Sequence, residues 1–413
     1  MIGFKCHRLD NGLRIVHHYD AATKMVAVNL LYDVGSSDEN PHKTGLAHLM
    51  EHLMFSGTKH VSNYDGMLQR AGGDSNAWTN IDVTNYYDIL PSQNVETALW
   101  LESERLLNLN LSVENIEIQK NVVIEEFKQR HLNQPYGDIL HLTHGLAYKK
   151  HPYRWPTIGL STETIKEFTL DDVLAFHRRH YNIGNLVVGI SGNVDFDKAV
   201  ALVEKWFGDI AAPASECMRN LPEEPQQTAM RFLSHKSAVP HNMIFKTYHM
   251  CGRCDEDYQA TDLLSDVLGN GQSSRFYKEL IQKSGMFADI DASVMGSRDP
   301  GLFYIRARLS NGVPFDKANA AIDNVLSRLL EGGVSDHEIK KYVNKYLSNK
   351  LFDNVGYAEK AVSLCSHELL WGAAGINTEN DKYRSLSPAD VHRAAKHVLR
   401  ESNCSLIYYG PDA

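Results

Sequence analysis

Residues 185–192 read NLVVGISG, and residues 403–410 read NCSLIYYG, an offset of 403 − 185 = 218 residues. Both segments are largely apolar runs between an asparagine and a glycine, a pattern typical of a buried β-strand. A helix start precedes each one at the same offset, FTLDDV at residues 168–173 and LSPADV at residues 386–391. The sequence therefore indicates a duplicated unit in which a helix leads into a strand.

The earlier parts of the two halves correspond more loosely. A strand-like segment at residues 26–34 and the helical segment after it have counterparts at residues 243–250 and 258–268. The stretch between the halves is rich in proline, alanine and charge, which predicts an exposed linker over residues 211–225. We expect two homologous domains, residues 1–210 and 227–413.

The length and composition fit a soluble enzyme of more than one domain. At 413 residues the chain exceeds what a single core usually organises. Strand-like segments at residues 13–18, 26–34, 86–90 and 186–192 alternate with long helices, which predicts an α+β fold. The formal charge of −9 is dispersed along the chain. It argues against a nucleic-acid partner and slightly favours basic or unfolded peptides.

No apolar run approaches the length of a membrane span. The first residues, MIGFKC, lack the apolar region of a signal peptide. We expect a cytoplasmic protein. Periplasmic or organellar residence stays open if an export segment has been removed.

The six cysteines are scattered along the chain: Cys6, Cys217, Cys251, Cys254, Cys365 and Cys404. Only Cys251 and Cys254 form a close pair, and this pair lacks the second Cys or His pair of a structural zinc site. It also follows a strand-like segment at residues 242–250 instead of opening a helix. We interpret the pair as part of a reduced loop. A metal or redox role is the alternative.

Residues 48–52 read HLMEH. In a helix over residues 45–57, the apolar side chains recur at core-facing spacing and leave His48, Glu51 and His52 on the other face. Two histidines at i and i+4 can bind one metal ion, with the glutamate beside the remaining coordination positions. The glutamate follows the first histidine by three residues, the inverted form of the zinc-protease motif. The pattern favours a zinc hydrolase over a row of surface histidines.

A catalytic zinc normally takes three protein ligands and keeps one position for water. A helix predicted over residues 112–130, with Ser112 as N-cap, carries Glu125 and Glu126. Either carboxylate could complete the site. The alternative is a solvated helix face, where glutamate pairs are common.

Three motifs together resemble one family. They are HLMEH, GGDSNAWT at residues 72–79, and KNVVIEEF at residues 120–127, whose second glutamate lies 126 − 52 = 74 residues after His52. The chain is similar to the inverzincin (M16) zinc peptidases, the family of pitrilysin, insulysin and the mitochondrial processing peptidase, in a short two-domain bacterial form. The resemblance implies that Glu126, and not Glu125, is the third ligand. It also implies mainly antiparallel sheets covered by helices, in two domains that form half of a clamshell.

The ligands imply a mechanism. Zinc held by His48, His52 and Glu126 would lower the pKa of its bound water to about 7 and polarise the peptide carbonyl. Glu51 would take the proton of that water as general base and return it to the leaving amine. Family members often carry a supporting glutamate two turns before the third ligand, where this chain has Gln119. The neutral amide removes one negative charge from the surroundings of the site.

The resemblance also implies a substrate site. In the family, the segment that matches Asn76, Ala77, Trp78 and Thr79 is an edge strand to which an extended peptide adds as a further strand. Such pairing gives affinity without selecting a sequence. An ordinary hairpin is the alternative. The expected activity is a zinc endopeptidase that cleaves extended peptides or unfolded protein segments in an enclosed chamber.

The second half departs from the family. Relatives carry an arginine and a tyrosine that hold the substrate, and this chain has Ile281 and Ala288 at those positions. Arg275 and Tyr277 lie nearby as local substitutes. We therefore expect a heterodimer with a homologous chain that carries the pair, or a homodimer of low activity. The rival hypotheses are a non-catalytic core subunit and a peptide-binding chaperone that retains zinc.

Overall fold

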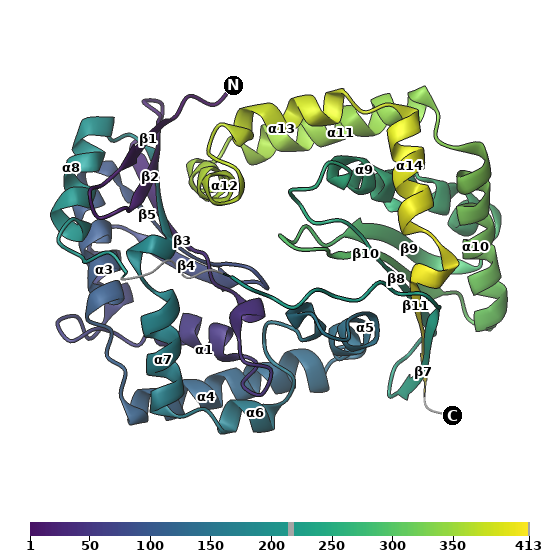
Figure 1. Cartoon of the computed structure of the whole chain (residues 1–413), viewed down its shortest axis with the longest axis horizontal. Coiled ribbons are helices and arrows are strands. Elements are labelled where there is room, and N and C mark those ends of the chain that lie inside the picture. Colours follow the sequence, from purple (N-terminus) through teal and green to yellow (C-terminus); the bar gives the residue numbers. More distant parts are fainter. Residues whose placement is uncertain (214–218, 412–413) are drawn as a thin grey trace. The chain divides into compact units, whose positions relative to one another are not determined.

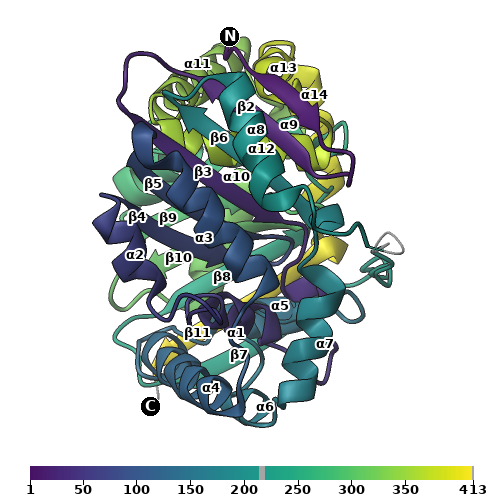
Figure 2. The same ribbon diagram turned by 90° about the vertical axis from the view of Figure 1, so that its left-hand side faces the viewer.

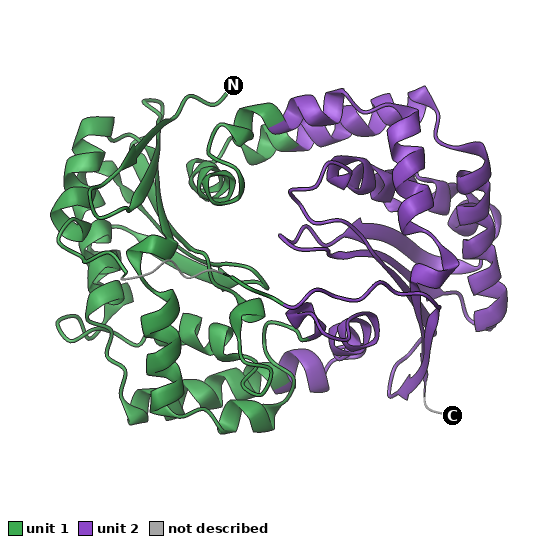
Figure 3. Cartoon of the chain, viewed as in Figure 1, with its two compact units in different colours: residues 1–127, 155–221, 350–378 green, residues 128–154, 222–349, 379–413 purple. Residues whose placement is uncertain are grey.

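The structure is a computed structural model that describes residues 1–213 and 219–411. Cys217 and part of the expected linker lie outside these residues. The chain forms two compact units, coloured separately in Figure 3. Unit 1 comprises Met1–Phe127, Trp155–Leu221 and Lys350–Thr378, and unit 2 comprises Lys128–Arg154, Pro222–Asn349 and Glu379–Ala413. None of the helices in the described ranges is long and apolar enough to cross a bilayer.

Unit 1 is built on a six-stranded sheet with the order β1-β2-β6-β3-β5-β4 (Figure 1). All neighbouring strands are antiparallel except β2 and β6, which run parallel. The strands are β1 (Lys5–Arg8), β2 (Arg14–Tyr19), β3 (Met25–Tyr32), β4 (Asp74–Thr79), β5 (Thr84–Pro91) and β6 (Leu186–Gly192). Strand β4 is therefore the last strand at one edge.

Helices cover both faces of this sheet, because alternate residues of each strand point to opposite sides. Ile15, Val28 and Val188 belong to the large core beneath α3 and α8, which Figure 2 shows in front of the sheet. Their neighbours Val16 and Val187 face α12 instead. The helices of unit 1 are α1 (Leu46–Leu53), α2 (Tyr64–Arg70), α3 (Val95–Leu107), α4 (Val113–Phe127), α6 (Thr162–Lys166), α7 (Leu170–His180), α8 (Phe196–Phe207) and α12 (Tyr357–Leu370).

Unit 2 repeats the architecture with the strand order β7-β11-β8-β10-β9. The strands are β7 (Arg231–Ser237), β8 (Met243–His249), β9 (Phe287–Val294), β10 (Leu302–Leu309) and β11 (Cys404–Pro411). The helices are α5 (Ile139–Ala147), α9 (Tyr258–Gly269), α10 (Phe315–Gly332), α11 (Asp336–Asp353, which continues into unit 1), α13 (Gly375–Arg384, which begins there) and α14 (Pro388–Val398), with π-helical turns at Lys128–Leu132 and Tyr277–Lys283.

Apart from the edge strand β1, the two sheets match strand for strand, from β2 and β7 to β4 and β9. The one parallel pair, β2 with β6, corresponds to β7 with β11. Capping boxes also repeat at the offset of 218 residues, Thr169 with Asp172 at α7 and Ser387 with Asp390 at α14. The prediction of a duplicated α+β fold with mainly antiparallel sheets is confirmed.

Each unit contains one helix from the other half of the sequence. Helix α5 packs on β7, β8 and β11 of unit 2, and α12 packs on β2, β3 and β6 of unit 1. The two helices begin at equivalent positions, since 357 − 139 = 218. The duplicated halves thus exchange equivalent helices. The two compact units therefore do not coincide with the two homologous halves of the sequence.

Two glycines allow a close backbone contact at the start of α1. Gly45 and Gly159 both have φ of +97°, in the left-handed region that side chains disfavour. A Cβ atom on Gly159 would lie 2.5 Å from the carbonyl oxygen of Thr44, and one on Gly45 would lie 2.7 Å from that of Ile158. The loop after residue 155 is therefore packed against the first turn of α1.

We expect Gly159→Ala to destabilise the protein by about 1–3 kcal/mol or more, because it adds both a steric clash and backbone strain. Gly145→Ala is the matched control. Gly145 is exposed within α5 and has nothing within 4 Å of an added Cβ. It should gain up to about 1 kcal/mol in the helix. Urea unfolding measures both, and a Gly159→Ala protein as stable as the parent contradicts the contact.

Candidate metal centre

Helix α1 carries the HLMEH motif on its partly exposed face. The core-facing residues Leu46, Leu49, Met50 and Leu53 are buried. His48, Glu51 and His52 are half-buried on the other face, as the periodicity predicts. The helix is shorter than the expected residues 45–57, since it ends at Leu53. The segregation of polar and apolar residues along the motif is nevertheless as expected.

A buried carboxylate holds the first turn of α1. Gly45, at the N-cap, has no side chain to accept the first amide hydrogens. The carboxylate of Glu39 instead accepts the N–H of Gly45 at 3.0 Å and of Ala47 at 2.8 Å. Burial raises the pKa of Glu39 well above its usual range, although both N–H donors oppose this shift. Glu39 thereby fixes the helix that presents the motif.

Helix α4 brings the third candidate ligand to α1. The two helices pack against each other. The hydroxyl of Ser112 accepts the N–H of Asn115 at 3.2 Å, so the predicted N-cap is present. Glu126 is half-buried and turns toward the two histidines, whereas Glu125 is exposed. Of the two glutamates, the structure brings Glu126 into the group.

One carboxylate oxygen of Glu126 lies 3.7 Å from Nε2 of His48 and 3.3 Å from Nε2 of His52. The imidazole rings stand nearly perpendicular, with centroids 4.8 Å apart. A tetrahedral zinc ion with ligand bonds of about 2.0–2.1 Å separates its ligands by roughly 3.3 Å. These separations and the two-nitrogen, one-oxygen donor set fit zinc. Among the described residues, this is the one group of three or more His, Cys, Asp or Glu side chains placed closely enough to hold a metal ion.

Glu51 is tied to the edge strand. The hydroxyl of Thr79, the last residue of β4, donates a 2.5 Å hydrogen bond to Glu51 Oε2. Tyr86 and Tyr181, whose hydroxyls lie 3.2 Å apart, are buried beside this carboxylate. Burial raises the pKa of both phenols, and the negative charge of Glu51 adds to the effect. The tyrosines therefore stay neutral next to Glu51.

The predicted substrate segment forms β4, which lies at the sheet edge and, among the described strands, pairs with β5 alone. Ala77 and Trp78 pack on opposite faces of the sheet, against the main core and the α12 core respectively. Asn76 is exposed, and Thr79 contacts Glu51. Gln119 is half-buried on α4, seven residues before Glu126 and so on the same helix face. The structure thus gathers β4, α1 and α4 around one group of side chains.

Arg275, one of the two candidate substitutes in unit 2, is engaged elsewhere. Arg275 donates to both carboxylate oxygens of Glu338, at 2.9 and 3.0 Å, and to the carbonyl of Gly333. Ile281 packs against the core of unit 2, and Ala288 is exposed on β9. No substrate-holding pair is evident at these positions.

The Cys251 and Cys254 pair shows no feature of a metal or redox site. Both residues are free cysteines. Burial raises the pKa of Cys251 to about 11, so it stays a thiol. Cys254 is exposed, and its pKa is also raised by partial burial. The pair lies in the loop that follows β8.

Neither the support of α1 by Glu39 nor the contact of Arg219 with the loop before α1 was predicted from the sequence. Glu39 lies outside the helix it caps, and the capping motifs that can be read from sequence place the acceptor at the N-cap itself. Arg219 lies in the linker, where local pattern carries no signal for a tertiary contact. The contacts of Arg219 join residues that are far apart along the chain.

Two family models match the chain. The model described as Insulinase (Peptidase family M16) matches residues 14–159, which include the motif and Glu126. The model described as Peptidase M16 inactive domain matches residues 167–346. Together the two models span most of the sequence. The half that carries HxxEH matches the first model, and the half without it matches the inactive-domain model.

Known proteins resemble this chain over almost its whole length. The zinc protease PqqE of Helicobacter pylori is 28% identical over 98% of this chain and 92% of its own. A crystal structure of a protease from Helicobacter pylori superposes with a TM-score of 0.94 at 26% identity, over 100% of both chains. Pitrilysin shares the fold, with a TM-score of 0.79 at 16% identity, over 99% of this chain but 45% of pitrilysin. The chain therefore belongs to peptidase family M16, as a zinc-dependent protease.

Proposed function

We propose that this protease is an endopeptidase that cleaves extended peptides or unfolded protein segments, with His48, His52 and Glu126 as zinc ligands and Glu51 as general base. The observation that carries the proposal is the hydrogen bond between Thr79 and Glu51. It joins the edge strand, where a peptide could pair, to the residue that would handle the proton.

Zinc, when bound, would act as a Lewis acid on the peptide carbonyl and would lower the pKa of a coordinated water. The protein residues do the rest. Glu51 follows His48 by three residues and precedes His52 by one, so its carboxylate lies on the same face of α1. It would accept the proton of the attacking water and deliver it to the nitrogen of the leaving amine.

The edge position of β4 supports an extended substrate. An edge strand presents main-chain N–H and C=O groups toward its open side, and a peptide in β conformation can satisfy them. Such pairing reads the main chain, so it would select for unfolded segments more than for sequence. We propose that Asn76, Ala77, Trp78 and Thr79 form this surface and that Gln119 supports the zinc ligands from α4.

We further propose that a homologous partner chain completes the enzyme. Ile281 and Ala288 cannot donate hydrogen bonds from their side chains, and Arg275 is held by Glu338. The chain also spans only 45% of pitrilysin, so a second chain of similar length would supply the difference. The partner would carry the arginine and tyrosine that this chain lacks.

Glu51→Gln should keep stoichiometric zinc and lose at least about a hundredfold in peptide turnover, because the amide cannot accept a proton. His52→Ala and Glu126→Ala should lose both metal and turnover. Glu125→Gln is the matched control and should behave like the parent, since Glu125 is exposed. Metal analysis and a quenched peptide assay measure these outcomes. Near-parental turnover by Glu51→Gln rejects the mechanism, and full zinc in Glu126→Ala rejects the ligand assignment.

The enzyme should cut a peptide or a reduced, unfolded protein but spare the same protein when it is folded and disulfide-bonded. The reason is that strand addition requires several residues of unpaired main chain. Mass spectrometry of the products compares the two states. Equal cleavage rates inside the folded core refute both strand addition and an enclosed chamber.

Adding a homologous chain that lacks HxxEH and carries the arginine and tyrosine should raise turnover about a hundredfold or more, the usual worth of one transition-state donor. The control is the same partner with its arginine replaced by alanine. Full turnover by the purified chain, unchanged by the partner, contradicts the need for a second subunit.

A further inference from the structure

The end of the linker is anchored on unit 1 through one side chain. The linker was expected to be exposed, and Asn220, Pro222 and Glu223 are exposed, whereas Leu221 and Glu224 are half-buried. Arg219 differs from the exposed residues, because only 13% of its side chain is accessible to solvent. A guanidinium that is buried needs partners for its N–H groups and its charge.

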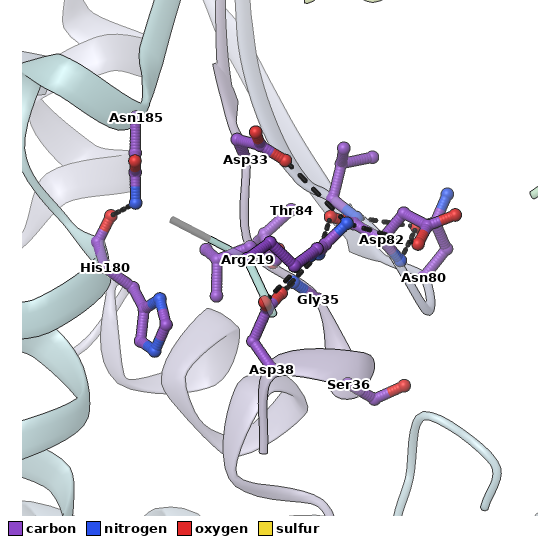
Figure 4. A network of polar contacts seen from close by, with 12 residues as sticks. Asp33, Gly35, Ser36, Asp38, Asn80, Asp82, Thr84, His180, Asn185 and Arg219 are labelled. Carbon is purple, nitrogen blue, oxygen red and sulfur yellow. Dashed lines mark hydrogen bonds and ion pairs between the residues drawn. The ribbon is translucent and has the colours of Figure 1, made fainter. Parts of the chain in front are cut away.

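Arg219 finds these partners in two loops. Its Nε donates to Asp38 Oδ1 at 2.9 Å, and a second nitrogen contacts the other oxygen of the same carboxylate. The guanidinium also donates to the carbonyl oxygen of Asp82 at 2.9 Å and to its carboxylate at 3.4 Å. Asp33 lies at 4.0 Å. Figure 4 shows the arginine between Asp38 on one side and Asp82 on the other.

Each loop adjoins a segment that contacts the helix of the metal ligands or Glu51. Asp38 closes a short 3₁₀ turn, and the next residue is Glu39, which holds the first amides of α1. Asp82 lies in the turn between β4 and β5, three residues after Thr79, which bonds Glu51. Arg219 therefore joins the segment that positions α1 to the segment that ends the edge strand.

Backbone contacts also join these two loops, and Gly35 lies so close to residues 80–82 that an added Cβ would be 2.5 Å from the Asn80 carbonyl oxygen. The N–H of Ser36 donates to the carbonyl of Asn80 at 3.1 Å, and the N–H of Ser37 donates to that of Ile81 at 2.9 Å. Removing the guanidinium would leave the carboxylates of Asp38 and Asp82 close together with their shared cation gone. Such uncompensated charge is costly in a largely buried place, and the loops could relieve it by moving apart.

We infer that Arg219 is a positioning residue, which sets the edge strand β4 against helix α1 and so fixes Thr79 relative to Glu51. This inference rests on the proposed peptidase function for its consequence in catalysis. A misplacement of the substrate strand by about 1 Å is enough to cost up to a hundredfold in rate. The linker between the halves thereby contributes to the geometry of the catalytic group.

The test compares Arg219→Gln, Arg219→Lys and the control Arg253→Gln in the full chain. Arg253 is a matched control because it is also largely buried and pairs with a carboxylate, Glu379 at 3.0 Å, but belongs to unit 2. Hydrogen–deuterium exchange follows residues 33–47 and 74–83. Zinc content and the kcat and KM for an extended peptide are measured on the same samples, per zinc-bound protein.

We expect faster exchange in both segments of Arg219→Gln, with zinc content retained and kcat/KM lowered about tenfold or more. KM should rise as well as kcat fall, because β4 is the proposed binding strand. Arg219→Lys should recover part of both effects, since it keeps the charge but loses the planar fork. Arg253→Gln should leave exchange in these segments and KM unchanged.

Unchanged exchange at residues 33–47 and 74–83 in Arg219→Gln overturns the inference. So does faster exchange with parental kcat and KM, because the arginine would then be structural only. A parent protein without zinc-dependent turnover rejects the proposed function instead. The exchange data then still decide whether Arg219 holds the two loops together.

Discussion

The approach of Glu126 to His48 and His52 is the constraint on which the rest of unit 1 depends. Three polar side chains from two helices place their ligand atoms within 4.8 Å of one another, although His52 and Glu126 lie 126 − 52 = 74 residues apart. Helix α1 is held at its start by Glu39 and by the glycine contact at residue 159, and α4 packs against it. Zinc needs its ligands preorganised in this way, because small errors in ligand placement weaken binding and catalysis.

The duplicated unit shows why one half carries the metal. Helix α9 follows β8 in unit 2 as α1 follows β3 in unit 1. Nine of its twelve residues are buried, including polar ones such as Gln259 and Thr261. Its half-buried positions at i, i+4 spacing hold Asp262 and Asp266, and the helix contains no histidine. The same sheet topology therefore supports a metal site in one unit and a packed core in the other.

The sequence predicted those features that are local or strongly periodic. The offset of 218 residues predicted the matching sheets, and the spacing of His48, Glu51 and His52 predicted their shared face. The assignment of Glu126 needed the family resemblance, because a glutamate pair on a helix is not specific by itself. The exchange of α5 and α12 could not be predicted, since either packing buries a similar apolar face. Glu39 accepts amides six and eight residues ahead of it, outside the capping motifs that are read from sequence, and the contacts of Arg219 span 137 and 181 residues.

X-ray absorption at the zinc edge of the metal-loaded protein tests the central claim most directly. We expect nitrogen and oxygen ligands at about 2.0–2.1 Å from the zinc, with the outer-shell signature of two imidazoles. A sulfur ligand at about 2.3 Å, or the signature of a single imidazole, would contradict it and move the metal to another part of the chain.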